Sequence, residues 1–168
     1  MDKRYWLIIG IVIVCMVNLY FISNSSDVVG SASVVVDNYT FSLPSNFEVL
    51  DNYQDHVSLN NSKSGLYVVV YHLHSKNAYD NYLKDFDNLK RDNNSVILSN
   101  GSINIKNCSV SAVYYQVGNN DDFKNRSLFF FKMYGDSFRI TMDNVNNKSE
   151  TIEVLELIVS SIRYNYKK

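Results

Sequence analysis

The octapeptide Ser127–Tyr134, SLFFFKMY, carries the strongest strand signal in this 168-residue chain. Successive side chains of a strand point to opposite faces, so three consecutive phenylalanines place large rings on both sides. A strand with apolar side chains on both faces has to be covered on each of them. We therefore expect Ser127–Tyr134 at the centre of a sheet, with one layer packed on each side.

Other strand signals lie on both sides of this segment. Val110–Val117 and Phe138–Met142 flank it, separated from it by the turn residues Gly118–Asp122 and Gly135-Asp136. A polar turn at 60–65 separates two extended runs and predicts a hairpin. The remaining expected strands are Val34–Leu43, Phe47–Leu50, His56–Leu59, Leu66–Leu73 and Ile103–Lys106. Pro44 terminates the first of them.

Two segments change to helical period. In the first, Asn77 and Asp80 resemble a helix cap, and the helix is expected to end near 92–94. The apolar side of this first segment comprises Tyr79, Tyr82, Leu83, Phe86 and Leu89. The second segment is Glu150–Arg163, with an apolar stripe at Ile152, Leu155, Ile158, Val159 and Ile162. The order of strands, helix, strands and helix predicts an α+β domain, a mainly antiparallel sheet packed with two amphipathic helices.

The heptapeptide Phe41–Phe47, FSLPSNF, begins this domain with an aromatic, an aliphatic and a proline, followed by a second aromatic. A hairpin, a helix, a meander and a C-terminal helix are expected after it. In this motif and this order the chain resembles the PsbP/DcrB superfamily of small extracytoplasmic domains, over about Val34 to Tyr164. The resemblance implies an antiparallel sheet sandwiched between helices, and export with attachment to a membrane. It implies no shared catalytic residues.

The N-terminal run Trp6–Ile22 is uncharged and almost entirely apolar, which predicts a short transmembrane helix. Lys3 and Arg4 precede it, and the next basic residue is Lys63, so the positive-inside rule keeps the N-terminus cytoplasmic. Residues 1–22 are thus expected to be a signal-anchor in the cell membrane, residues 23–33 a flexible linker and residues 34–168 an outer domain.

Two alternatives for this segment remain open. One is a cleaved signal peptide ending near Ser23-Asn24-Ser25, which would release a secreted protein. The other is a lipoprotein signal ending at Cys15. The anchor and both alternatives place the domain outside the cell. The second cysteine of the chain, Cys108, lies in this domain and is expected to be a small buried hydrophobe.

The frequency of glycosylation motifs also favours an outer location. Eight Asn-x-Ser/Thr sequences occur, against the ~3.5 that random placement would give. All eight follow the apolar run, at Asn24, Asn38, Asn60, Asn93, Asn100, Asn107, Asn125 and Asn147. These asparagines are candidate N-glycosylation sites.

Composition and motifs argue against most activities. A net charge of −1 disfavours a nucleic-acid partner, and the sequence has no nucleophile elbow or phosphate loop. The best metal candidate is His72-Leu73-His74, in which two imidazoles share one strand face. His56 is expected opposite Val69 or Val70, away from that pair. We expect His72 and His74 to be solvent-facing side chains at a strand end, with a metal-binding module or metal-dependent enzyme as the alternative.

The chain is also rich in aromatic residues, with 13 tyrosines and nine phenylalanines. Strand packing accounts for most of them. If one sheet face were open, exposed rings would suit a protein or glycan partner. The sequence thus predicts a non-catalytic binding or accessory domain of the cell envelope that needs no cofactor.

Overall fold

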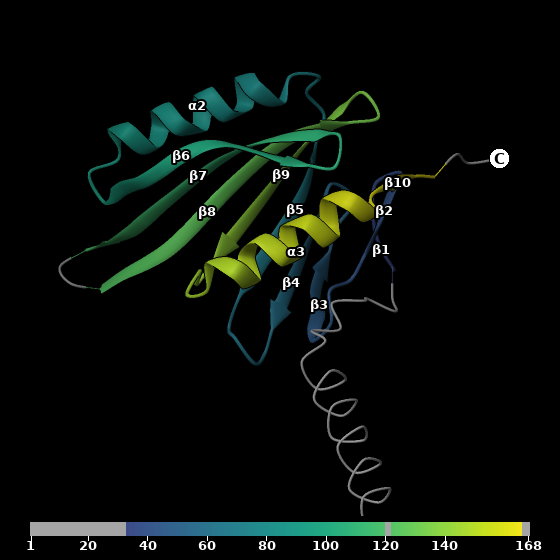
Figure 1. Cartoon of the computed structure of the whole chain (residues 1–168), viewed down its shortest axis with the longest axis horizontal. Helices are drawn as coiled ribbons and strands as arrows, with labels where there is room; N and C mark the ends of the chain where they lie inside the picture. Colours follow the sequence, from purple (N-terminus) through teal and green to yellow (C-terminus); the bar gives the residue numbers. More distant parts are fainter. Residues whose placement is uncertain (1–32, 120–121, 166–168) are drawn as a thin grey trace, which may run out of the picture.

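A computed structural model describes residues 33–119 and 122–165 of the chain. These residues form two antiparallel sheets and two helices (Figure 1). The predicted anchor, most of the predicted linker and the sequon at Asn24 lie outside the described residues. Within the described ranges, no helix is long and apolar enough to cross a membrane.

The strands are β1 (Ser33–Val36), β2 (Tyr39–Ser42), β3 (Phe47–Asn52), β4 (His56–Asn61), β5 (Tyr67–Leu73), β6 (Ser95–Ile105), β7 (Cys108–Asn119), β8 (Asp122–Met133), β9 (Asp136–Asp143) and β10 (Arg163–Tyr164). The helices are α2 (Ala78–Arg91) and α3 (Lys148–Ser161). Seven strands form one sheet in the order β3-β4-β5-β9-β8-β7-β6, and β1, β2 and β10 form a smaller sheet. The predicted α+β class and antiparallel pairing are confirmed.

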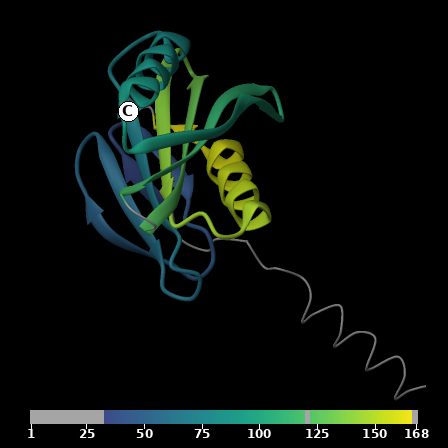
Figure 2. The same ribbon diagram turned by 90° about the vertical axis from the view of Figure 1, so that its left-hand side faces the viewer.

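The strand β8 lies inside the large sheet between β9 and β7, as its three phenylalanines predict. Phe129 and Phe131 are buried in the larger core, which α3 and the small sheet close. Phe130 is buried on the opposite face in a smaller core beneath α2. Figures 1 and 2 show α2 and α3 on opposite sides of the sheet. Both faces of β8 are therefore covered.

The helix α2 begins where its predicted cap places it, whereas α3 begins at Lys148, two residues before the expected start at Glu150. The side chain of Asn77 accepts hydrogen bonds from the first amides of α2, and that of Asn147 does the same for α3. Only part of the predicted apolar side of α2 is buried, because Tyr79 and Leu83 remain exposed. The C-terminal helix ends two residues before Arg163, which belongs instead to β10.

Several strands differ from prediction, and three differences matter most. The run Val34–Leu43 is a hairpin, because Asp37 and Asn38 form a two-residue turn between β1 and β2. The strand expected at Ile103–Lys106 begins eight residues earlier, at Ser95, since pairing with β7 continues through exposed and polar positions. The short β10 was not predicted, because two residues carry no periodic signal.

Cys108 is buried at the start of β7, as predicted, and its thiol is free. Burial raises the pKa of this thiol, so it stays protonated and unreactive at neutral pH.

Candidate functional site

The best candidate site surrounds His72, near the end of β5. Its side chain is only 6% exposed and lies opposite Phe138 of β9, on the side of the larger core. The prediction of a solvent-facing histidine is therefore wrong for His72, because the β1–β2 hairpin closes over that face. His74 follows the strand and is exposed, as predicted, and its ring centroid lies 5.0 Å from that of His72.

Asp37, in the turn between β1 and β2, brings a carboxylate to this histidine. Its φ of +52° is in the left-handed region, which aspartate adopts more readily than most residues. The Asp37 amide donates to the Gln54 carbonyl at 2.7 Å, and the His72 amide donates to the Asp55 carbonyl at 2.8 Å. Residues 54 and 55 thus hold the turn and the strand in place beside each other.

Two carboxylates flank the His72 ring. Nδ1 lies 2.9 Å from Oδ2 of Asp37, and Nε2 lies 3.4 Å from Oδ2 of Asp136. Both distances are within ion-pair range, yet neither ring nitrogen makes a hydrogen bond of acceptable angle. Ring nitrogens bond along the plane of the imidazole, so the buried ring is close to two anions without being hydrogen-bonded to either.

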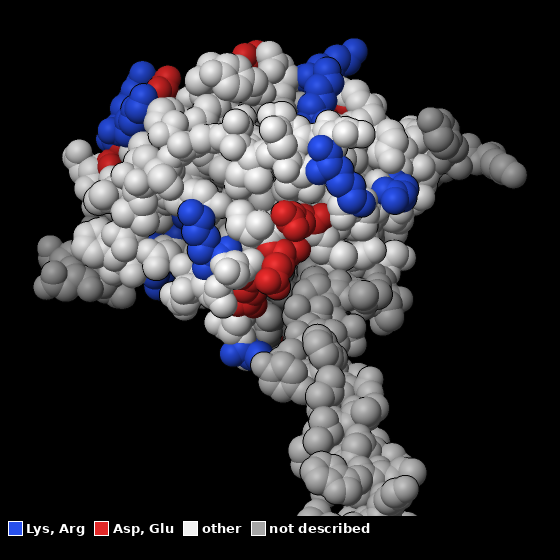
Figure 3. Space-filling model, in the orientation of Figure 1, with Lys and Arg blue, Asp and Glu red and all other residues white. Residues whose placement is uncertain are grey.

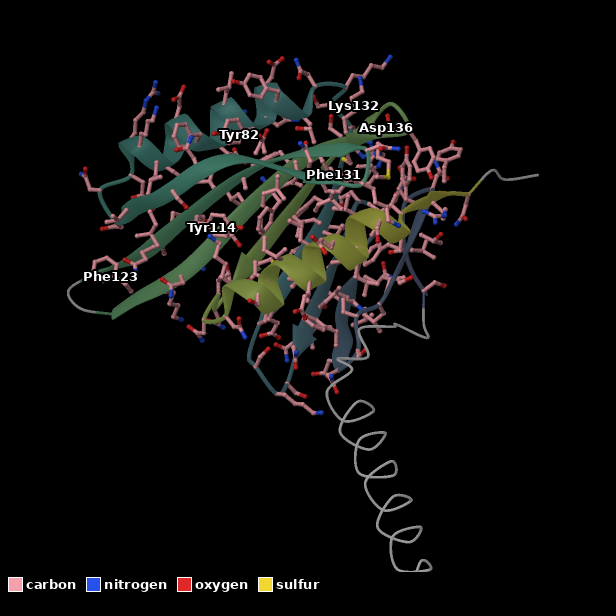
Figure 4. All side chains as sticks on the ribbon, in the orientation of Figure 1. Tyr82, Tyr114, Phe123, Phe131, Lys132 and Asp136 are labelled. Atoms are coloured by element: carbon pink, nitrogen blue, oxygen red, sulfur yellow. The ribbon has the colours of Figure 1, made fainter. Side chains whose placement is uncertain are left out.

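Asp136 is held in turn by Tyr39. Figure 4 shows Asp136 at the end of the sheet where β8 turns into β9. The buried hydroxyl of Tyr39 donates to Oδ2 of Asp136, and its ring packs 5.1 Å from that of His72. Burial raises the pKa of Tyr39, and the hydrogen bond and charge of Asp136 raise it further. Tyr39 is therefore a neutral donor that fixes the Asp136 carboxylate.

Asp37, His72 and His74 each bring a ligand atom to one place. One such atom from each of the three side chains lies within 4.8 Å of the other two. Two of these residues stand in the His72-Leu73-His74 motif, whereas Asp37 was missed. The signal for it was the pair Asp37-Asn38, turn-forming residues inside an otherwise apolar extended run.

His56 is separate from this cluster, as predicted, although its register differs. It lies opposite Tyr71, one or two residues beyond the predicted partner, because β4 continues through Asn61 and the turn is therefore centred later in the chain than expected. Its ring stacks on Tyr53 and Tyr71, with centroids 4.7 and 5.1 Å away. The Arg139 guanidinium lies 4.3 Å over Tyr71. This row of stacked side chains runs from β4 across β5 to Arg139 of β9, whose guanidinium also pairs with Asp85 of α2.

A polar hollow of about 450 Å³ opens next to Asp37. Its aromatic wall is Tyr53, a residue that is 57% exposed although its ring stacks on that of His56. The lining residues are Val35, Asp37, Asn38, Asn52, Tyr53 and Gln54. The hollow thus combines one exposed ring face with amide and carboxylate groups.

No protein-family model matches the chain, and no curated protein matches it. Solved structures do. A protein from Bacteroides thetaiotaomicron VPI-5482 is 10% identical with a TM-score of 0.58, and the alignment covers 80% of this chain. The alignment covers 48% of that protein, so this chain spans about half its length.

Two further structures align with most of this chain at low identity. Cyanobacterial PsbP (CyanoP) from Synechocystis sp. PCC 6803 is 15% identical, with a TM-score of 0.48 and coverage of 81% of this chain and 95% of that one. LpqN, involved in cell envelope biogenesis of Mycobacterium tuberculosis, is 8% identical, with a TM-score of 0.47 and coverage of 76% and 83%. At these identities the likeness concerns the fold alone, and this chain shares the α+β fold of the Bacteroides thetaiotaomicron protein.

Proposed function

We propose that this protein is a membrane-anchored accessory domain of the cell envelope that acts outside the cell by binding and catalyses no reaction. The observation that carries the proposal is the uncharged run Trp6–Ile22, preceded by two cations and followed by no basic residue before Lys63. That asymmetry favours a cytoplasmic N-terminus and an outer domain. Seven of the eight sequons lie in that domain, which supports the same orientation.

Protease accessibility tests the location. A C-terminally tagged full-length chain in intact cells is expected to lose its tag to an added protease, while a cytoplasmic marker survives. Recovery of the intact mass of the tagged full-length chain from the membrane fraction would support the anchor over a cleaved signal peptide. A tag that is protected until the cells are lysed would contradict the orientation.

A glycan is the partner that the surface supports best. A sugar ring can stack on the exposed face of Tyr53, while its hydroxyls meet the Asn38, Asn52 and Gln54 amides and the Asp37 carboxylate. The hollow is polar and borders solvent, whereas hot spots of protein interfaces lie in well-packed, fully desolvated pockets. On the face shown in Figure 3, acidic side chains gather over α3 and basic side chains are scattered. Nucleic-acid binding proteins cluster their basic side chains, so this pattern argues against a nucleic-acid partner.

The partner class is tested with purified cell-wall polysaccharide and two matched tyrosines. Tyr53 and Tyr79 are each 57% exposed, but only Tyr53 lines the hollow. Tyr53→Ala is expected to weaken retention on immobilised polysaccharide about tenfold, the loss of one stacking contact. Tyr79→Ala should bind like the wild type. Equal retention of both variants would contradict a glycan site at this hollow.

A further inference from the structure

We infer that Asp37, His72 and His74 bind one divalent transition-metal ion, with zinc as the expected ion. The ligand set would be two imidazole nitrogens and one carboxylate oxygen, all within 4.8 Å of one another. Zinc takes histidine nitrogen and aspartate oxygen, whereas magnesium and calcium prefer oxygen ligands alone. The composition of the cluster therefore selects a borderline transition metal.

The charge around His72 favours a bound cation. Asp37 and Asp136 approach opposite nitrogens of one buried ring. Within residues 33–119 and 122–165, neither carboxylate has a lysine or arginine at ion-pair distance. Partly buried negative charge requires compensation. A proton on His72 would balance one carboxylate, whereas a divalent ion balances both.

The distances fit a metal centre after small side-chain rotations. Two ligand atoms 2.0–2.2 Å from a tetrahedral zinc ion lie roughly 3.4 Å apart. Nδ1 of His72 and Oδ2 of Asp37 are 2.9 Å apart, and no pair in the cluster exceeds 4.8 Å. The exposed His74 is free to rotate toward the other two. The geometry assigns Nδ1 of His72 to the metal, beside Asp37.

The surroundings of His72 match those of a metal-binding histidine. Such histidines donate the N–H of the second ring nitrogen to a carboxylate or carbonyl, which fixes the ring. Here Nε2 lies 3.4 Å from Asp136 without a well-angled hydrogen bond, and the Tyr39 hydroxyl holds that carboxylate in place, so a small rotation of the ring would let Nε2 donate to it. The backbone bonds to residues 54 and 55 fix Asp37 and His72 in the same way. The cluster is thus built on a strand and a pinned turn.

The exposed His74 keeps the cluster open to solvent, and the hollow borders another proposed ligand, Asp37. Three protein ligands leave a fourth position of a tetrahedral ion open to water or to a partner's donor atom. The metal site does not depend on the glycan proposal, because Tyr53→Ala removes no ligand and is expected to leave zinc binding unchanged.

The test uses the full chain, purified in detergent, treated with a chelator, dialysed and titrated with zinc chloride by calorimetry. One zinc ion per chain is expected. Asp37→Asn and His74→Ala should each weaken binding at least about tenfold. Asparagine tolerates the positive φ at position 37, and His74 is exposed, so both variants keep the fold. His56→Ala, an imidazole outside the cluster, should bind zinc like the wild type.

Cobalt gives a second, spectroscopic measurement. A chain loaded with Co²⁺ is expected to show visible absorption bands of a tetrahedral nitrogen and oxygen site, and these should disappear in His74→Ala. No stoichiometric zinc binding by the wild type would overturn the inference. Equal affinity in the wild type, Asp37→Asn and His74→Ala would overturn it as well, as would the same loss in His56→Ala.

Discussion

Asp92 joins α2 to β6 through its side chain. Its carboxylate accepts hydrogen bonds from the Ser95 hydroxyl at 2.6 Å and from the Asn94 amide at 3.0 Å. These two bonds, the hydroxyl first, lower the pKa of Asp92 below its ordinary value of 3.8. Because the pKa is depressed in the folded state, the stabilisation is complete above pH 3.8 and is lost as the pH falls through the folded value.

The downward direction of this pKa shift predicts how an Asp92→Ala variant behaves. Its urea midpoint should be lower than that of the wild type at pH 7. The difference should shrink at pH 3, below the ordinary value of 3.8, because the unfolded chain then binds a proton at Asp92 more readily than the folded one. Ser95→Ala, which removes the first donor, should show a smaller change of the same sign. A difference in midpoint that is the same at both pH values would contradict this role for Asp92.

Residue patterns could predict part of the candidate site. His72 and His74 stand two apart on a strand, so their proximity is local and visible in the sequence. Asp37 and Asp136 lie 35 and 64 positions from His72, and only the packing of the hairpin and the β8–β9 turn brings them there. The burial of His72 could not be predicted either, because it depends on the β1–β2 hairpin, which the sequence pattern showed as one strand.

Among the elements, β8 shows most directly how side-chain pattern determines placement. Phe129 is buried beside Tyr114 on the α3 side, and Phe130 meets Tyr82 of α2 with ring centroids 6.1 Å apart. Figure 4 shows Tyr82 on α2 and Phe131 within the sheet region closed by α3. The alternation of these rings was readable from the sequence, because strand period needs no long-range information.

The two faces of β8 can be separated by substitution. Phe129→Ala and Phe130→Ala should each lower the free energy of unfolding by about 3–5 kcal/mol, the usual cost of a phenylalanine-sized cavity. Phe130→Ala should raise hydrogen exchange of the α2 amides more than that of α3, because Phe130 belongs to the smaller core beneath α2.

Phe129→Ala serves as the matched control, since Phe129 belongs to the larger core that α3 closes. Its effect on exchange should be stronger in α3 than in α2. Hydrogen exchange measured by mass spectrometry on both variants distinguishes the helices. The same exchange pattern in the two variants would mean that the layers are not separately packed on β8.

At the scale of the whole molecule, the fold sorts the sequons by access. Asn93 and Asn107 are exposed in turns, and neither side chain makes a hydrogen bond within the described part of the chain. Asn38 also lies in a turn but is half-buried, and other sequon side chains are engaged. Asn125 accepts from Gln116, Asn100 donates to the Tyr82 hydroxyl, and Asn147 caps α3. A glycan needs free space at the asparagine amide, so the two exposed turn positions suit it best.

We therefore predict that a secretory host that modifies Asn-x-Ser/Thr attaches glycans chiefly at Asn93 and Asn107 of the folded region. The Asn93→Gln, Asn107→Gln double variant should lose most of the glycosidase-sensitive mass of the full chain, measured by intact mass spectrometry. Asn100→Gln and Asn125→Gln, the matched controls, should lose little, because these amides lie on strands and bond to neighbouring side chains. An unchanged mass in the double variant would show that accessibility in the folded domain does not govern modification of this chain.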